Sequence, residues 1–319
     1  MRRALVTGAA GQLGRALVRE LRARGVAVNA LVRTPIQAQD VRADGADIYA
    51  GTLSDTALLA TAARGVDVVF HLAGGVRGAG DATADVLNRQ GTARLLEALR
   101  GLDPVVVFAS SAAVHGDRSG LWVGEDYPAH PDTVYGASKL AAEQLLRESS
   151  HRVRVARLGM VLGVGPTGPM RAMHLGRLRS GHAWLPGDGT NHVPVVHLED
   201  ALAALVLLAE TGEDGTVAHI AAPGTPSLRD VFHALAGAAG APPARFLGTW
   251  VPSAIQRRAA DLVERASARA GLRPPVTPDT LALWSASVRL RTDTLTGHGF
   301  AFRHPEPHFD ALLGLEGAP

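Results

Sequence analysis

Short apolar runs alternate with amphipathic segments through the first half of the chain. Six mainly apolar runs predict buried strands, over residues 3–6, 26–32, 47–50, 66–72, 104–109 and 153–158. Apolar positions three and four residues apart predict helices over residues 12–24, 83–99 and 134–148. Strands that are apolar throughout and separated by helices are typical of a parallel sheet covered on both faces. The pattern therefore predicts an α/β doubly wound (Rossmann) fold with right-handed crossovers.

The second half of the chain is less regular. Glycine and proline are frequent just after residue 158, and proline-rich joints separate the later helical patterns. These patterns predict an extended segment at 190–197 and helices at 198–209, 228–239 and 253–270. The first half therefore has the regular strand–helix pattern of a sheet domain, whereas the second half has the irregular pattern of a less compact lobe.

This difference in pattern predicts that the chain is divided into two domains. We expect a dinucleotide-binding Rossmann domain over residues 1–163, to which residues 192–222 return to complete the sheet. A smaller, mostly C-terminal substrate-binding lobe is expected from residues 164–191 and 223–319. Substrate specificity is expected to reside in this lobe.

Composition narrows the class of protein. Apolar residues make up 46% of the 319 residues, enough for a sizeable core. The longest plain apolar run, 201–209, is far short of the roughly 20 residues that span a bilayer. The chain opens with no charged-then-apolar leader. We therefore expect a soluble, cytoplasmic protein with no membrane partner.

Charge and cysteine content exclude further classes. The chain has no cysteine, which excludes disulfides, thiolate nucleophiles and zinc–sulfur sites. The formal net charge is only +2, and acidic and basic residues are interspersed. Because no basic stripe is present, we expect no nucleic-acid partner and predict a small-molecule substrate instead.

A glycine-rich turn follows the first predicted strand and opens the first predicted helix. Its spacing is G-x-x-G-x-x-G, one residue longer than the usual dinucleotide fingerprint. Glycines let the backbone approach a pyrophosphate, and the N-terminus of the following helix attracts the anion. The alternative is a set of packing glycines with no ligand. The candidate cofactor contacts are Gly8, Ala10, Gly11, Gln12, Leu13 and Gly14.

The end of the second strand bears on the choice of cofactor. An acidic residue there would bind the ribose 2′-hydroxyl of NAD, whereas an arginine favours the 2′-phosphate of NADP. The chain has Arg33 and no acid at this point, so NADP(H) is preferred and NAD(H) stays open. Thr52 and Leu53 follow the third strand and are candidate adenine contacts. The alternatives are a solvated arginine and a plain turn.

Tyr135 and Lys139 are four residues apart at the start of a predicted helix, so they share one face. Lys139 is the one lysine among 32 basic residues, and an arginine cannot copy its compact charge. A nearby ammonium favours the ionised form of a phenol. Ser111 follows the fifth strand, where ligands of doubly wound sheets bind, and Ser110 is the fallback. Asn88 is unusual in the middle of a helix and is expected to fix local backbone or a water relay; the alternative is a surface polar residue.

These segments appear along the chain in a recognisable order. The segments 7–14, 71–74, 88–92, 110–116 and 135–139 together resemble the extended short-chain dehydrogenase/reductase family, the NAD-dependent epimerase/dehydratase type. Within this family, the segments most resemble those of dihydroflavonol reductases and 3β-hydroxysteroid dehydrogenases. The resemblance covers the first 160 residues and resumes at 194–200.

The resemblance implies roles for individual residues. Tyr135 would be the acid/base, Lys139 would orient the cofactor ribose and make the phenol more acidic, and Ser111 would position the substrate oxygen. Hydride would pass between nicotinamide C4 and a substrate carbon. The cofactor would also contact Ser110 and the segment Leu72, Ala73 and Gly74, and a homodimer is a family-level expectation.

Three residues depart from the family pattern. His115 replaces a frequent tyrosine, Thr52 replaces a common aspartate, and Met160 stands where nucleotide-sugar enzymes usually carry asparagine. No R-x-G-D-like phosphate clamp follows late in the chain. An oxidoreductase acting on a secondary alcohol or carbonyl is therefore favoured. The alternatives are a nucleotide-sugar epimerase or dehydratase and, in another class, a non-catalytic dinucleotide sensor.

Histidines and tryptophans of the second half are weaker candidates. His192 with His197, or His304 with His308, suggests a metal, but no carboxylate cluster accompanies either pair in the sequence, so no metal is predicted. The second lobe also holds three tryptophans that line a substrate pocket or pack in a core, Trp184, Trp250 and Trp284.

Overall fold

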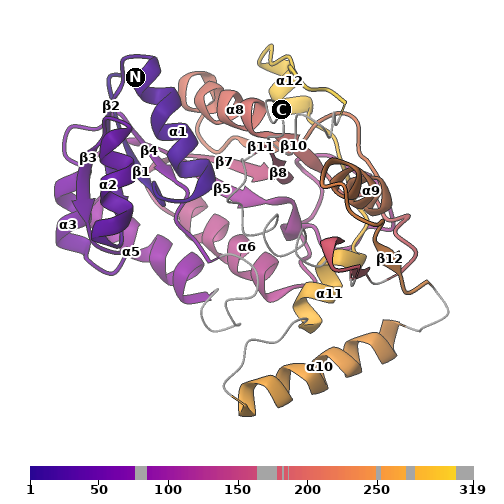
Figure 1. Cartoon of the computed structure of the whole chain (residues 1–319). Coiled ribbons are helices and arrows are strands. Elements are labelled where there is room, and N and C mark those ends of the chain that lie inside the picture. Colours follow the sequence, from indigo (N-terminus) through magenta and orange to yellow (C-terminus); the bar gives the residue numbers. More distant parts are fainter. Residues whose placement is uncertain are drawn as a thin grey trace.

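The fold was analysed in a computed structural model of the whole chain. The structure describes residues 1–75, 85–163, 178–181, 183–185, 187–248, 253–270 and 277–306. The chain winds outward from the centre of one large sheet, and a smaller group of helices lies beside the carboxyl ends of its strands (Figure 1). No helix in these ranges is both long and apolar enough to cross a membrane.

Seven parallel strands form the main sheet, in the order β11-β7-β5-β4-β1-β2-β3. Their bounds are β1 (Arg3–Thr7), β2 (Ala27–Val32), β3 (Asp47–Ala50), β4 (Val68–His71), β5 (Val105–Ser111), β7 (Arg152–Leu158) and β11 (Val217–Ile220). The first strand lies inside the sheet and the chain winds away from it in both directions. The predicted doubly wound α/β fold is confirmed.

Helices cover both faces of this sheet because side chains of each strand alternate between them. Along β1, Ala4 and Val6 pack in one apolar cluster and Leu5 packs in the other. One face is covered by α1 (Gln12–Ala23), α2 (Pro35–Ala43) and α8 (Leu198–Thr211). The other is covered by α3 (Thr56–Ala62), α5 (Gly91–Ala98) and α6 (Val134–Arg147).

The structure adds detail to two predictions about regular elements. The helix expected over 83–99 contains, within the described residues, a π-helical turn, η1 (Val86–Gln90), before α5. Within residues 192–222, which were expected to return to the sheet, β11 joins the main sheet and α8 covers one face, whereas β10 (Val195–His197) pairs with β8 (Met160–Leu162) in a separate parallel pair. The sequence pattern cannot distinguish these pairings, since both strands are short and apolar.

The second lobe is built from helices and two-residue strands. Its elements are β9 (Trp184–Leu185), α9 (Leu228–Ala238), β12 (Arg245–Phe246), α10 (Ser253–Arg269) and α11 (Pro278–Ser285), whereas α12 (Asp293–Gly297) packs on the main sheet through Leu295. Trp284 is 7% exposed and packs on Phe232, with ring centroids 5.1 Å apart. It therefore contributes to a core, whereas Trp250 lies outside the described residues.

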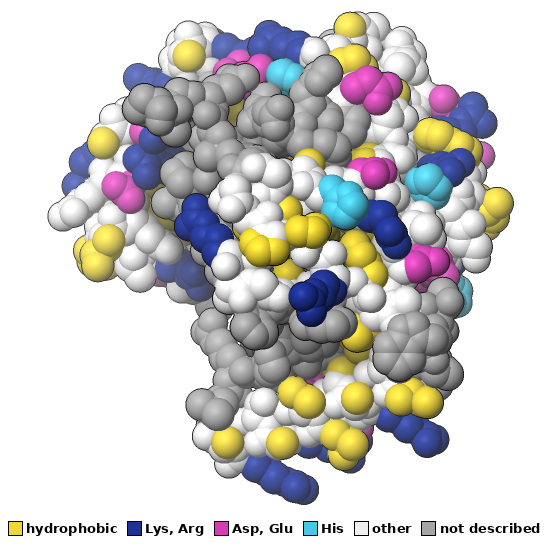
Figure 2. Space-filling model, turned by 45° about the vertical axis from the view of Figure 1, so that its right-hand side comes forward, with side chains coloured by type: hydrophobic (Ala, Val, Ile, Leu, Met, Phe, Trp, Pro, Cys, Tyr) yellow, Lys and Arg dark blue, Asp and Glu magenta, His cyan; other side chains and the backbone are white. Residues whose placement is uncertain are grey.

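Short strand pairs connect the lobe to the main sheet. β6 (Trp122–Val123) pairs with β13 (Arg289–Leu290). Helix α10 lies at the lower edge of the molecule, away from the sheet (Figure 1). Apolar side chains are exposed there (Figure 2), among them Ile255 at 57% and Leu262 at 67%.

Candidate active site

The glycine turn is shaped so that only glycine fits. Gly8 has a φ of +71°, and a Cβ there would lie 2.7 Å from the backbone nitrogen of Ala73. A Cβ on Gly14 would overlap the carbonyl oxygen of Gly8. Side chains at either position would therefore fill the loop through which a pyrophosphate approaches the backbone.

The N-terminus of α1 has the properties of an anion site. Gly11 is its N-cap, no side chain caps it and its first turn holds no acid. The amide nitrogen Nε2 of Gln12 is buried and has no hydrogen-bond partner. Since the first N–H groups of a helix have no partner inside it, a bound diphosphate fits the donors that this loop leaves unpaired.

A buried histidine holds the end of β4 against this loop. His71 Nδ1 lies 2.8 Å from the hydroxyl of Thr7, and Nε2 lies 3.0 Å from that of Thr92. Burial and the nearby charge of Lys139 lower the pKa of His71 to about 3, so the ring is neutral. The Thr7 hydroxyl also accepts the N–H of Ala73 at 3.2 Å. The predicted cofactor segment Leu72–Gly74 is thereby tied to the glycine turn.

The predicted adenosine contacts lie at the ends of neighbouring strands. Arg33 is exposed beyond β2, and no acidic residue in the described ranges forms an ion pair with it. Thr34 caps α2 beside it, accepting from the N–H of Gln37. Thr52 is exposed beyond β3, whereas Leu53 is 9% exposed and lies against Gly91. The Leu53 side chain is therefore part of the core, and an adenine contact would involve its backbone.

Asn88 lies inside the π-helical turn and is 1% exposed. Its Oδ1 accepts from the N–H of Gly75 at 3.0 Å, and its Nδ2 donates to Ser138 Oγ at 2.8 Å. Ser138 Oγ in turn donates to the carbonyl oxygen of Tyr135 at 2.8 Å. Of the two predicted roles, these contacts favour fixing the backbone: Asn88 links the end of β4 to the first turn of α6.

The side chain of Lys139 is only 5% exposed, although lysine normally carries a charge and lies at the surface. Its Nζ donates to the carbonyl oxygen of Ala109 at 2.8 Å and lies 4.9 Å from the ring centroid of Phe108. Burial lowers the pKa of Lys139, and the neighbouring Tyr135 and Glu143 oppose that shift. A Cβ on Gly74 would lie 3.0 Å from Nζ, so glycine keeps the ammonium accessible from this side.

The two serines at the end of β5 have different surroundings. Ser110 Oγ donates to Glu143, whose carboxylate also pairs with Arg157 at 2.9 Å. Ser111 Oγ accepts from the N–H of Ala113 at 3.2 Å, and the side chain lines a cavity. Ser111 is therefore the serine whose hydroxyl faces the space for a substrate. The Ser110 hydroxyl is used inside the core, and its contact with the cofactor stays a prediction.

The start of α6 packs against the turn that follows Ser111. This turn is the 3-10 helix η2 (Ala112–Val114), and a Cβ on Gly136 would overlap the carbonyl oxygen of Ala113. Thr133 caps α6 by accepting from the N–H of Gly136 at 3.0 Å. The half-buried Tyr135 lies between these two residues in sequence. The predicted Ser111, Tyr135 and Lys139 are thereby brought to one edge of the sheet.

The cavity beside Ser111 is mainly apolar. Polar groups at its start come from Ser111, Asp132 and Thr133. Its apolar lining comes from β7, β8, the segment before β10 and the second lobe, with Leu158, Met160, Val193, Pro194, Leu228, Ala282, Leu283, Trp284, Ala286 and Val288. Met160 therefore lies in the wall of this cavity, where the sequence departs from nucleotide-sugar enzymes.

His115, which also departs from the family pattern, does not line this cavity. Its Nε2 lies 2.9 Å from Nε2 of His219, which donates through Nδ1 to the carbonyl oxygen of Arg291 at 2.8 Å. Burial lowers the pKa of His115 to about 3 and that of His219 to about 4. The neutral pair joins the end of β5 to β11 in the interior. Sequence analysis missed it, because 103 residues separate the two side chains.

A cluster of histidines and an acid lies at the start of α8. One ligand atom each of His197, Glu199 and His304 falls within 4.8 Å of the others. The sequence showed no carboxylate cluster beside these histidines; in the structure one carboxylate, that of Glu199, joins them, with its Oε2 3.4 Å from His304 Nε2. His197 Nδ1 already accepts the N–H of Glu199, and Arg303 lies 3.7 Å from the same carboxylate. The absence of a metal stays a prediction, and His308 lies outside the described residues.

A glycine turn fitted to a diphosphate and a buried lysine one turn beyond a tyrosine, at the carboxyl edge of a parallel sheet, define an NAD(P)-binding Rossmann enzyme. The comparison with family models agrees over most of the chain. Residues 4–221 match the model of the NAD dependent epimerase/dehydratase family. The chain belongs to this family, and its placement in a dihydroflavonol-reductase-like subgroup stays a prediction.

Individual relatives include both reductases and sugar-modifying proteins. A 4-hydroxy-2-methyl-3-oxo-4-farnesyl-3,4-dihydroquinoline-1-oxide ketoreductase from Stigmatella aurantiaca is 32% identical over 223 residues, which are 67% of this chain and 66% of that protein. The matched part thus spans just under two thirds of this relative.

Solved structures resemble the whole chain. MoeE5 in complex with UDP-glucuronic acid and NAD is 25% identical, with a TM-score of 0.73 and coverage of 97% of this chain and 96% of that one. Human epimerase family protein SDR39U1 with NADPH also has a TM-score of 0.73, at 21% identity and 97% coverage of both chains. The structural neighbours therefore include proteins with NAD and with NADPH.

Proposed function

We propose that this protein is an NADP(H)-preferring oxidoreductase that interconverts a secondary alcohol and a carbonyl on a mainly apolar substrate. The observation that carries the proposal is the buried Lys139, one turn beyond Tyr135, at the sheet edge where Ser111 opens into an apolar cavity. A non-catalytic sensor would need the glycine turn but neither Tyr135 nor Lys139.

The chemistry follows from the charges at this edge. The bound nicotinamide would supply or accept the hydride. Tyr135 donates a proton to the carbonyl oxygen as it becomes an alkoxide, or removes it in the reverse direction. Lys139, held by the carbonyl of Ala109, places a positive charge where the phenolate forms. Ser111 donates its hydroxyl hydrogen to the same substrate oxygen and fixes its position.

The cavity wall supports the choice of substrate class. A nucleotide-sugar substrate carries a diphosphate, which needs cations and hydrogen-bond donors. The cavity beside Ser111 instead presents Met160, Val193 and other apolar side chains beyond its polar start. An apolar ketone buries its hydrocarbon part there and leaves only its carbonyl for Ser111 and Tyr135.

The surroundings of Arg33 support the phosphorylated cofactor. Its guanidinium is exposed beyond β2, beside the capped N-terminus of α2, so two sources of positive charge face the position of a ribose 2′-substituent. Substituting Arg33→Ala should weaken NADPH binding about tenfold, as loss of one charge-assisted contact does, and leave NADH within about twofold. Fluorescence titration with both cofactors checks this, and equal weakening of the two would overturn the choice.

Product analysis tests the reaction itself. The protein is mixed with NADPH and a panel of aliphatic and aromatic ketones, or with NAD⁺ or NADP⁺ and UDP-glucose. Absorbance of the reduced cofactor is followed and the products are identified. The proposal predicts one alcohol formed per NADPH consumed with an apolar ketone. Conversion of UDP-glucose to an epimer, without net cofactor consumption and with no ketone reduced, would instead establish the epimerase alternative.

A further inference from the structure

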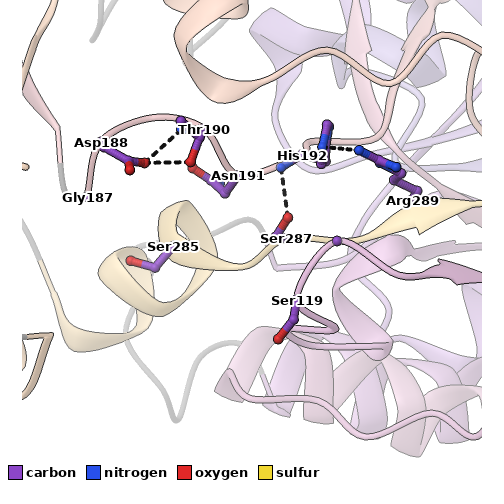
Figure 3. A pocket seen from close by; sticks show the side chains of 10 residues that line it. Ser119, Gly187, Asp188, Thr190, Asn191, His192, Ser285, Ser287 and Arg289 are labelled. Carbon is purple, nitrogen blue, oxygen red and sulfur yellow. Dashed lines mark hydrogen bonds between the residues drawn. The ribbon is translucent and has the colours of Figure 1, made fainter. Parts of the chain in front are cut away.

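A second cavity, of about 590 Å³, lies next to the catalytic one. Its lining comes from three segments that are far apart in sequence: the loop before β6, the turn at 187–192 and the segment that leads into β13 (Figure 3). The side chains that line it are polar, namely Ser119, Asp188, Thr190, Asn191, His192, Ser285, Ser287 and Arg289. His192 lines both cavities and so stands between them.

Arg289 is the positive charge of this cavity. The side chain is half-buried, and its Nη2 donates to Nε2 of His192. His192 Nδ1 lies 3.3 Å from the carbonyl oxygen of Thr225 and donates to it, which leaves the lone pair of Nε2 for Arg289. The guanidinium also stands 5.8 Å from the ring centroid of Trp122. These neighbours orient the guanidinium without neutralising it.

No acid in the described part of the chain pairs with Arg289. Two residues further on, Arg291 shows the usual arrangement, with Nη2 2.6 Å from a carboxylate oxygen of Asp293. The acid of the cavity, Asp188, is bound to the N–H and hydroxyl of Thr190 at 3.0 and 2.7 Å. These bonds lower the pKa of Asp188, and its carboxylate and Arg289 lie at opposite ends of the view (Figure 3).

The wall of the cavity also holds a strained residue. Ser119 has a φ of +50°, and within the described ranges no other residue except glycine has a positive φ. Asp117 accepts from the N–H of Ser119 at 2.9 Å and from that of Ser287 at 3.0 Å, which holds the loop in this conformation. Backbone strain that the surroundings maintain is concentrated at functional sites.

We propose that this cavity binds a small ligand through a carboxylate or phosphate group held by Arg289. The guanidinium presents several N–H groups in a planar fork, of which His192 engages one side. An oxyanion would supply the missing counter-charge, and the other polar side chains that line the cavity would face the rest of the ligand. The group belongs either to a separate small anion or to the acidic end of the substrate, reaching past His192.

Direct binding of inorganic phosphate tests the site without any turnover. Phosphate is titrated by calorimetry into protein saturated with NADP⁺, which occupies the anion site of the glycine turn, with Arg289→Gln and, as matched control, Arg291→Gln, which removes the same charge from the same segment. We expect saturable binding that is at least about tenfold weaker in R289Q and within about twofold of wild type in R291Q. Equal binding by R289Q and wild type, or no saturable binding by wild type, would overturn the proposal.

A second variant separates the charge from its geometry. Arg289→Lys keeps the positive charge and loses the fork, so it should bind phosphate better than R289Q and more weakly than wild type. Circular dichroism of each variant confirms that the protein is folded. If R289K binds phosphate as tightly as wild type while both are folded, the planar fork does not hold the anion and the proposed geometry fails.

Steady-state kinetics distinguish whether the anionic group belongs to the substrate or to a separate anion. This experiment rests on the proposed function. KM is compared for a 3-oxo acid and its ethyl ester. An increase of about tenfold for the acid alone in R289Q assigns the cavity to the acidic end of the substrate. KM values within about twofold for both, with phosphate binding lost, assign it to a separate anion. Failure to reduce either ketone tests only the proposed function and leaves the phosphate titration as the test of the site.

Discussion

The carboxyl edge of the main sheet and the lobe that faces it hold their side chains in different ways. At the edge, Asn88, Lys139 and His71 are buried polar groups, each bound to residues far away in the sequence. In the lobe, the cavity wall is formed mainly by apolar side chains such as Leu228 and Trp284, which pack in the core of the lobe. Directional bonds fix reacting groups closely, whereas packing sets shape and size. The edge should therefore determine the rate, and the lobe the choice of substrate.

The largest expected effect is at Lys139. Substituting Lys139→Met removes the ammonium beside Tyr135 and leaves a side chain of similar length, so kcat should fall about 10³-fold or more. Lys139→Arg should not restore the rate, because the planar guanidinium does not fit the buried space between Ala109 and Gly74. Steady-state kinetics with NADPH and a ketone measure both. Activity of K139M within tenfold of wild type would remove Lys139 from the mechanism.

The second effect concerns stability and compares a buried ion pair with an exposed one. Glu143 is fully buried against Arg157, and Glu143→Gln leaves that guanidinium uncompensated, which should lower the free energy of unfolding by about 3 kcal/mol. The exposed pair of Asp261 and Arg265 on α10 is the control, because Asp261→Asn should cost below about 1 kcal/mol. Urea unfolding measures both. Equal losses would contradict the distinction between the buried edge and the exposed helix.

Acid should weaken the interior through its neutral histidines. The pKa values of His71 and His115 are lowered to about 3, and that of His219 to about 4. Below pH 6.5 the unfolded chain binds protons that the folded chain does not, so stability falls on acidification, by about 1.4 kcal/mol per pH unit for each histidine. Unfolding at pH 7.5 and 5.0 tests this. His71→Asn should reduce the change in unfolding free energy per pH unit by the contribution of one histidine. No change with pH would mean that these rings become protonated in the folded protein as well.

The smallest effect is expected in the lobe. Met160→Gln places a polar group in the cavity wall, so KM for an apolar ketone should rise a few-fold, as for loss of part of an apolar contact, while kcat stays within about twofold. Kinetics with a short and a long aliphatic ketone measure this. A fall in kcat with unchanged KM would show that the wall also positions the reacting groups.

The sequence predicted every strand of the main sheet except β11, and it indicated the residues that meet at the candidate active site, because both follow from local patterns. Continuous apolar runs mark buried strands, and the spacing of Tyr135 and Lys139 places them on one helix face. The short helices α2 and α3 were not predicted, although Thr34 and Asp55 cap them. With nine and seven residues, they are too short for apolar periodicity to stand out.

Other features depend on contacts between distant segments and left no local signal. The pairing of β6 with β13, which places Arg289 over its cavity, joins two-residue strands more than 160 residues apart. The His115–His219 contact and the Ser110–Glu143–Arg157 cluster are likewise formed only by the fold. Single polar residues in a sequence do not reveal whether they are buried or with whom they pair.

The most direct test of the account is a single-turnover measurement on the phenol itself. Wild type and Tyr135→Phe are each loaded with NADPH, mixed with excess ketone, and followed by absorbance of the reduced nicotinamide. We predict that Y135F binds NADPH within about twofold of wild type and oxidises it at least about 10³-fold more slowly, since the proton donor alone is missing. Oxidation of NADPH at the wild-type rate by Y135F would contradict the claim that Tyr135, beside Lys139, transfers the proton.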